Sequence, residues 1–334
     1  MLTVYTRRRK TPVDARSRSC EPGGGLLFTG GHRLGTSRMS PPDLPLYLGW
    51  PFFSSIVFAI GLLWIKQANE RGASAAAVTL VTNACAGIAF TPLWMAGGTL
   101  QPWPMWWQPA AVGGLYLLGQ ICTFLALERG DVSVAAPLLS VKVLLVAVLL
   151  TWMDGASHHW SLWTSTFLAT AGIAIIQRSQ PAQATGRVLP SILYALLAAG
   201  SYALFDVVVQ RWSRTWGTGR LLPLAFWMSG LLSCLAWPWL SRGDFSRPEV
   251  RKPLLLGGFL FAIQSLSIGA SIGLYGDAAR INIVYSLRGL WGVLLAWVLS
   301  RWMVTSESHY RPSVMLWRLF GALLLTLAIV LAIV

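Results

Sequence analysis

Long apolar stretches follow one another along the chain from residue 46 to residue 334, separated by short connections. A helix needs about 20 apolar residues to cross the hydrocarbon core of a bilayer, which is roughly 30 Å thick. The expected fold class is therefore an all-α integral membrane protein. Runs near that length predict ten membrane-spanning helices: Leu46–Ile65, Ser74–Met95, Ala110–Leu127, Val132–Met153, Leu162–Ile176, Leu189–Val209, Leu221–Trp239, Leu254–Leu274, Ala279–Met303 and Val314–Val334.

The composition agrees with a chain that lies mostly in lipid. Hydrophobic residues make up 55% of the 334 residues and charged residues 11%, whereas a typical soluble domain is about 25% charged. These values exclude a water-soluble globule, a disordered chain and a disulfide-stapled secreted module. The four Cys and four His form no metal-binding pattern, so we predict no metal and no cofactor.

Residues 1–43 differ from the rest of the chain, because they are basic, rich in Gly and without helical periodicity. We expect a disordered tail here; a translation start at Met39, which would remove most of the tail, is a second interpretation. A basic flank before a first membrane helix commonly contacts lipid headgroups. We therefore expect no nucleic-acid partner, although the chain carries a net charge of +14.

A repeat relates the two halves of the chain. Gly130-Asp131 recurs 146 positions later as Gly276-Asp277, and Ser140-Val141-Lys142 recurs at the same offset as Ser286-Leu287-Arg288. The offset contains five predicted helices, and an odd number of helices inserts the second copy upside down. We predict a 5+5 inverted repeat with copies at 44–178 and 188–334. Inverted repeats suit alternating access, since exchanging the conformations of the halves converts an outward opening into an inward one.

Ten helices, the 5+5 repeat and one further motif together resemble a known family. The motif reads Ala126-Leu127-Glu128-Arg129-Gly130-Asp131-Val132-Ser133-Val134-Ala135-Ala136-Pro137-Leu138. It is similar to the EamA-type members of the drug/metabolite transporter (DMT) superfamily, and the resemblance covers about residues 45–334. It implies secondary or facilitated transport of a small metabolite, with a binding cavity between the two repeats. Many members carry Pro in the middle of the fourth and ninth helices, where this chain has Lys142 and Arg288.

Two cations lie near the middle of predicted spans, Lys142 in the fourth and Arg288 in the ninth. Each costs roughly 2.5–3.5 kcal/mol at that depth, so each should face the bundle interior. Asp206, in the sixth span, is the expected counter-charge or a proton-coupling group. One hypothesis is a structural ion pair of Asp206 with either cation. The other is that both cations hold an anionic group of the substrate, because two cations and one acid leave one positive charge uncompensated.

Further polar and aromatic side chains within the spans are candidate substrate ligands. Tyr202 and Tyr285 precede Asp206 and Arg288 by about one helical turn, and Trp291 is placed to stack on Arg288. We expect Asp131 and Asp277 to cap the helices that follow them. The candidate substrate-binding set is Lys142, Arg288, Gln120, Gln264, Asn83, Tyr202, Tyr285 and Trp291.

The function expected from these features is secondary or facilitated transport of a small metabolite with an anionic group. A first alternative is a carrier of a neutral, zwitterionic or cationic solute, in which Lys142 and Arg288 are internally paired. A second is a membrane-embedded enzyme acting on a lipid phosphate, although we predict no enzyme. The expected partners are a small-molecule substrate and the lipid bilayer, with a homodimer left open. The expected location is the cytoplasmic (inner) membrane of a bacterium, and the orientation of the termini is left open.

Overall fold

The computed structural model describes residues 45–128, 138–154, 160–178, 188–240, 243–291, 294–295 and 312–333. The expected tail at 1–43, the segment that holds Asp131, and residue 334 lie outside these ranges. Every regular element over the described residues is helical, which confirms the all-α class. Residues 43–334 form one unit.

The first half begins with a short 3₁₀ turn, η1 (Leu46–Leu48), that leads into α1 (Gly49–Glu70). Helix α2 (Ala75–Phe90) is capped by Ser74, whose side chain accepts from the Ala77 amide, and continues as η2 (Thr91–Ala96). A connection with a second 3₁₀ turn, η3 (Trp103–Met105), precedes α3 (Trp107–Glu128). The remaining helices of this half are α5 (Lys142–Asp154) and α6 (Trp160–Arg178).

The second half begins with α7 (Val188–Trp216), which is followed by α8 (Thr218–Ser233) and its 3₁₀ extension η4 (Cys234–Trp239). After the single turn α9 (Gly243–Ser246) comes α10 (Pro248–Tyr275). The last elements are α11 (Ala278–Tyr285) and α13 (Pro312–Ile333).

Each of the ten predicted spans contains helix among its described residues, but the lengths differ. Within these ranges six helices are long and apolar enough to cross a membrane: Leu46–Glu70, Ala75–Ala96, Trp103–Ala126, Ile192–Trp216, Thr218–Trp239 and Pro248–Tyr275. Three more are apolar but shorter: Lys142–Met153, Trp160–Ile176 and Phe320–Ile333.

The prediction of one unbroken helix from Ala279 onward is wrong. Helix α11 ends at Tyr285, and helix resumes at Arg288 after a turn at residues 286–287. At this point the Ser286 side chain donates to the Ile283 carbonyl oxygen at 2.5 Å. A serine that bonds back to its own helix competes with the backbone pattern and bends the helix.

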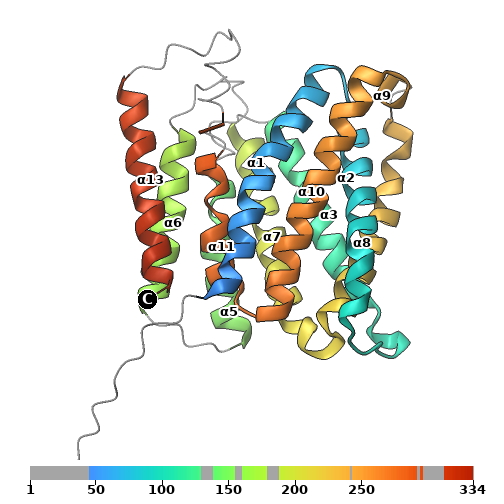
Figure 1. Cartoon of the computed structure of the whole chain (residues 1–334), viewed down its shortest axis with the longest axis horizontal. Coiled ribbons are helices and arrows are strands. Elements are labelled where there is room, and N and C mark those ends of the chain that lie inside the picture. Colours follow the sequence, from blue (N-terminus) through green and yellow to red (C-terminus); the bar gives the residue numbers. More distant parts are fainter. Residues whose placement is uncertain are drawn as a thin grey trace, which may run out of the picture. The chain divides into compact units, whose positions relative to one another are not determined.

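The helices pack in pairs that link the two halves (Figure 1). Helix α1 lies along α10, and α3 lies along α7; α2 packs against α8, and α6 runs beside α13. Glycines allow the backbones of α6 and α13 to approach each other closely. A Cβ added to Gly172 would lie 2.8 Å from the Gly321 carbonyl oxygen, and one added to Gly321 would lie 2.7 Å from the Gly172 carbonyl oxygen. Lipid tails are as apolar as hydrophobic side chains, so membrane helices associate mainly through close packing. Small residues such as glycine let the two backbones approach closely enough for this.

Candidate functional site

The two Ser-x-cation motifs coincide with matching irregularities in the helices. Residues 140–141 form a turn before α5 begins at Lys142, and residues 286–287 form a turn before helix resumes at Arg288. The Val143 amide donates to the Ser140 carbonyl oxygen, and the Gly289 amide donates to that of Ser286, each at 3.2 Å. These are the tighter bonds of a 3₁₀ turn. Each mid-span cation therefore stands where a helix restarts.

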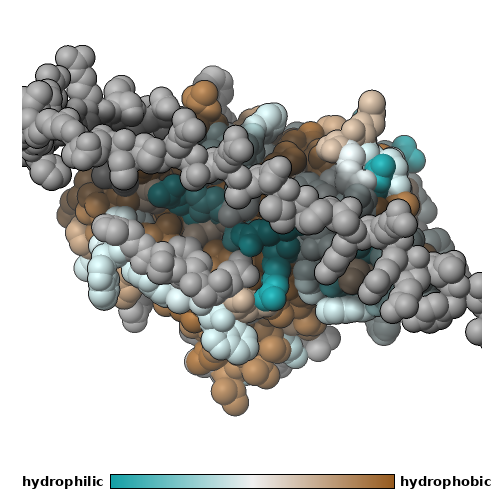
Figure 2. Space-filling view, turned by 90° about the horizontal axis from the view of Figure 1, so that it is seen from below, coloured by the Kyte–Doolittle hydropathy of each residue, from teal (hydrophilic) through white to brown (hydrophobic). Residues whose placement is uncertain are grey.

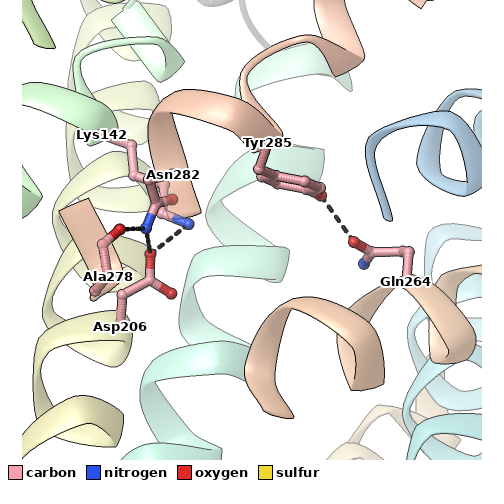
Figure 3. A network of polar contacts seen from close by, with 6 residues as sticks. All are labelled: Lys142, Asp206, Gln264, Ala278, Asn282 and Tyr285. Carbon is pink, nitrogen blue, oxygen red and sulfur yellow. Dashed lines mark hydrogen bonds and ion pairs between the residues drawn. The ribbon is translucent and has the colours of Figure 1, made fainter. Parts of the chain in front are cut away.

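Lys142 forms a buried ion pair with Asp206 (Figure 3). Its Nζ lies 2.7 Å from Asp206 Oδ2, and the two residues are 7% and 1% exposed. Asn282 Nδ2 donates to the same oxygen at 2.7 Å and to the Ala278 carbonyl oxygen at 2.8 Å. Of the pairings left open by the sequence, the structure contains the one between Asp206 and Lys142. Helices α5, α7 and α11 meet at this cluster.

Arg288 has different surroundings. Its guanidinium lies over the rings of Tyr285 and Phe58, 4.4 and 5.3 Å from their centroids. The side chain is partly exposed, and no carboxylate oxygen of the described residues lies within 4.0 Å of its nitrogens. The expected stacking on Trp291 is wrong. The Trp291 indole instead donates to Ser55 Oγ at 2.9 Å and meets the Phe52 ring edge-on.

A chain of hydrogen bonds continues from Tyr285 across the interior. The Tyr285 hydroxyl donates to Gln264 Oε1 at 2.8 Å, and Gln264 Nε2 donates to Ser265 Oγ at 2.7 Å. Ser265 Oγ in turn lies 2.9 Å from the Tyr116 hydroxyl. Tyr202 lies beside the other cation, with its ring centroid 5.6 Å from Lys142 Nζ. Tyr202 therefore lies beside Lys142, and Tyr285 connects Arg288 to Gln264.

Asn83 and Gln120 belong to a separate group that joins α2, α3 and α8. Asn83 Nδ2 donates to Gln120 Oε1, and Gln120 Nε2 donates to Thr82 Oγ1 at 2.8 Å. Ser229 Oγ donates to Asn83 Oδ1 at 2.7 Å. Both amides are buried, and their hydrogen bonds serve contacts between helices. The structure thus divides the candidate residues into two sets.

Asn282 and Tyr47 take part in the polar contacts, and the sequence reasoning missed both. Asn282 is an amide inside a predicted span, and that signal could have identified it. Tyr47 Oη donates to Asp277 Oδ2 at 2.7 Å. Asp277 also accepts from the Arg280 amide at 3.2 Å and caps α11, which confirms its predicted capping role.

Polar residues also gather at one end of the helices. Figure 2 views the end at which α7 and α10 finish and α11 begins, and hydrophilic residues lie near the centre of this face with hydrophobic ones around them. Buried polar contacts lead from this end into the protein. Gln210 Oε1 accepts a hydrogen bond from the Ala278 amide at 2.8 Å, at the start of α11. Asn282 lies one turn farther along the same helix. The polar end is therefore linked to the Lys142–Asp206 pair.

Comparison with known proteins agrees with this architecture. Residues 46–178 match the EamA-like transporter family, a family of non-enzymatic membrane transporters. A protein of known crystal structure shares the fold with a TM-score of 0.61, at 16% identity over 86% of this chain and 96% of its own. No curated protein sequence matches the chain.

Proposed function

Since residues 46–178 belong to the EamA-like transporter family of the DMT superfamily, we propose that this protein carries a small solute with an anionic group. The match over residues 46–178 implies a multi-pass membrane protein that transports small solutes. We propose further that transport is secondary or facilitated and proceeds by alternating access. The proposed binding site lies between two five-helix repeats. The proposed location is a bacterial cytoplasmic membrane, and a homodimer remains a prediction.

The helix packing supports the inverted repeat. If the first helix of one half corresponds to the first of the other, then the α1–α10 contact corresponds to α7–α3. Exchanging the two halves turns the α2–α8 contact into itself, and the same holds for the α6–α13 contact. All four of these contacts occur in the structure. In Figure 1, α1 runs from the lower end upward, whereas α7 runs downward. Opposite directions are expected when the second copy is inserted upside down.

The observation that carries the anion proposal is that Arg288 has no carboxylate of the described residues beside it. Asp206 neutralises Lys142 at 2.7 Å, whereas Arg288 contacts two aromatic rings and has no described carboxylate within ion-pair distance. A cation at mid-span is costly unless water or an anion accompanies it. A guanidinium can bind a carboxylate or a phosphate with two parallel hydrogen bonds.

We propose that Arg288 binds the anionic group, with Tyr285, Gln264 and Tyr202 contacting the rest of the solute. The bonds of Asn83 and Gln120 suit a packing role, and Trp291 supports α1 through Ser55.

A thermal-shift measurement on the purified protein tests this proposal with panels of organic anions, zwitterions, cations and neutral solutes. A ligand at 100 times its Kd stabilises the native state by about 2.7 kcal/mol. We expect at least one carboxylate or phosphate to raise the melting temperature of the native protein. The shift should fall in Arg288→Lys and vanish in Arg288→Gln.

Arg251→Gln is the matched control, because Arg251 is an exposed arginine on α10. It should keep the full shift. The proposal is overturned if only zwitterions, cations or neutral solutes stabilise the protein, or if Arg288→Gln responds to the anion as the native protein does.

A further inference from the structure

The two mid-span cations have corresponding neighbours but unequal partners. At offsets of 144 to 146 residues, Lys142 corresponds to Arg288 and Phe58 corresponds to Tyr202. The contacts obey this correspondence, because Tyr202 lies beside Lys142 and Phe58 lies beside Arg288. Asp206, one turn beyond Tyr202 on α7, has no acidic counterpart. The matching position one turn beyond Phe58 on α1 is Leu62.

This difference coincides with a difference in burial. Asp206 is 1% exposed, whereas Leu62 is 44% exposed. The acid on α7 is thus enclosed, whereas the hydrophobic side chain at the equivalent place on α1 lies at the surface of the helices. The Lys142–Asp206 pair on the α7 side of the site therefore has no acid–base counterpart at the corresponding positions 62 and 288.

Further contacts tie the two halves together at the end where α7 finishes. Arg211 Nη1, on α7, donates to the Met153 carbonyl oxygen of α5 at 3.3 Å. Tyr47, just before α1, donates to Asp277 at the start of α11. Both contacts join an element of the first half to one of the second, as the Lys142–Asp206 pair does. The pair is the buried member of this set and the one between full opposite charges.

We propose that Lys142, Asp206 and Asn282 form a one-sided gate, which closes the end of the carrier where α7 finishes. This inference rests on the proposed function, because a gate presupposes alternating access. Opening that end requires α5 to separate from α7, and Lys142 then leaves Asp206. Among the described residues, the corresponding positions on α1 and at Arg288 form no equivalent pair, because Leu62 cannot bind Arg288. The carrier therefore rests with the α7 end closed. Lys142 controls the conformation, while Arg288 binds the solute.

Asn282 is the positioning residue of the gate. Its amide donates to Asp206 Oδ2 and to the Ala278 carbonyl oxygen, so it fixes the carboxylate relative to α11. Removing Asn282 should weaken the gate without abolishing the ion pair. A purely local packing role for these three residues would leave the distance between α5 and α7 unchanged.

The gate is tested by measuring the distance between two spin labels with pulsed electron paramagnetic resonance. The full chain is studied in lipid nanodiscs without added solute. Spin labels are placed at Trp152→Cys on α5 and Arg214→Cys on α7, both exposed positions, after Cys20, Cys85, Cys122 and Cys234 are replaced by Ala. The gate-intact protein should give one short distance. In Lys142→Met/Asp206→Leu, which leaves no unpaired charge, the ratio of long to short distances should rise about tenfold.

Two further variants make the result specific. Asn282→Leu keeps the ion pair and should give an intermediate ratio. Glu70→Gln removes the carboxylate of the exposed Lys66–Glu70 pair on α1 and should leave the distribution unchanged. An unchanged distribution in both Lys142→Met/Asp206→Leu and Asn282→Leu overturns the gate. Because no solute is present, that result leaves anion binding at Arg288 untouched, and a failure of anion binding leaves the distances untouched.

Discussion

The buried Lys142–Asp206 pair makes a strong prediction about stability. The two atoms lie 2.7 Å apart, and neither residue is more than 7% exposed. Removing one member of such a pair leaves a buried charge without its partner, which costs about 3–5 kcal/mol. We therefore expect Asp206→Leu to lower the free energy of unfolding by that amount, and Lys142→Met to have a similar effect.

The double variant Lys142→Met/Asp206→Leu should behave differently from the sum of its parts. Replacing both members by apolar residues of similar size removes two desolvation costs together with the attraction, and is often neutral or stabilising. Leu is the residue already present at the corresponding position 62. We expect the double variant to lie within about 1 kcal/mol of the native protein, so that the cycle gives a large coupling energy.

Denaturation by SDS in mixed micelles, followed by tryptophan fluorescence, measures these free energies. The exposed pair of Lys66 and Glu70 provides a control cycle, because its nitrogen and oxygen are 4.0 Å apart and both side chains are 65% exposed. Its coupling energy should be about 0.3–0.5 kcal/mol. Additive losses in the Lys142 and Asp206 cycle would refute the reasoning, since additivity means that the two charges do not depend on each other.

Two other predictions concern helix packing. Gly321→Val should destabilise the protein by about 1–3 kcal/mol, because its Cβ would meet the Gly172 carbonyl oxygen at 2.7 Å. Gly114→Ala is the control, because nothing lies within 4 Å of the added Cβ. It should be neutral or stabilising in the same unfolding assay. Asn83→Leu should cost about 1–3 kcal/mol, because Ser229 and Gln120 lose a buried partner, while anion-induced thermal shifts should persist. Equal stability of Gly321→Val and Gly114→Ala, or loss of the anion response in Asn83→Leu, would contradict these two assignments.

The sequence predicted most of the helical architecture because apolar length is a direct requirement of the bilayer. It also predicted that Asp206 pairs with a mid-span cation, since a charge at that depth needs a partner. The breaks before Lys142 and Arg288 were not predicted. Their position depends on backbone bonds at Ser140 and Ser286, which apolar length does not reveal, although the Ser-x-cation repeat marked both places.

The partners of the interior polar groups could not be deduced from spacing along one helix. Asp206 had two candidate cations in different helices, and the choice of Lys142 depends on how α5 and α7 pack. Asn83 and Gln120 are amides within spans, like Gln264, yet they bond to each other across helices. Sequence spacing gives the face of a helix, whereas the neighbour on that face comes from the tertiary fold.

The central claim is that Arg288 supplies the uncompensated charge that binds a transported anion. Solute counterflow in proteoliposomes tests it most directly, with the anion that gives the largest thermal shift and equal amounts of each reconstituted protein. The account predicts exchange of labelled anion by the native protein and by Arg251→Gln, and exchange at the protein-free background rate by Arg288→Gln. Exchange by Arg288→Gln at the native rate would contradict it.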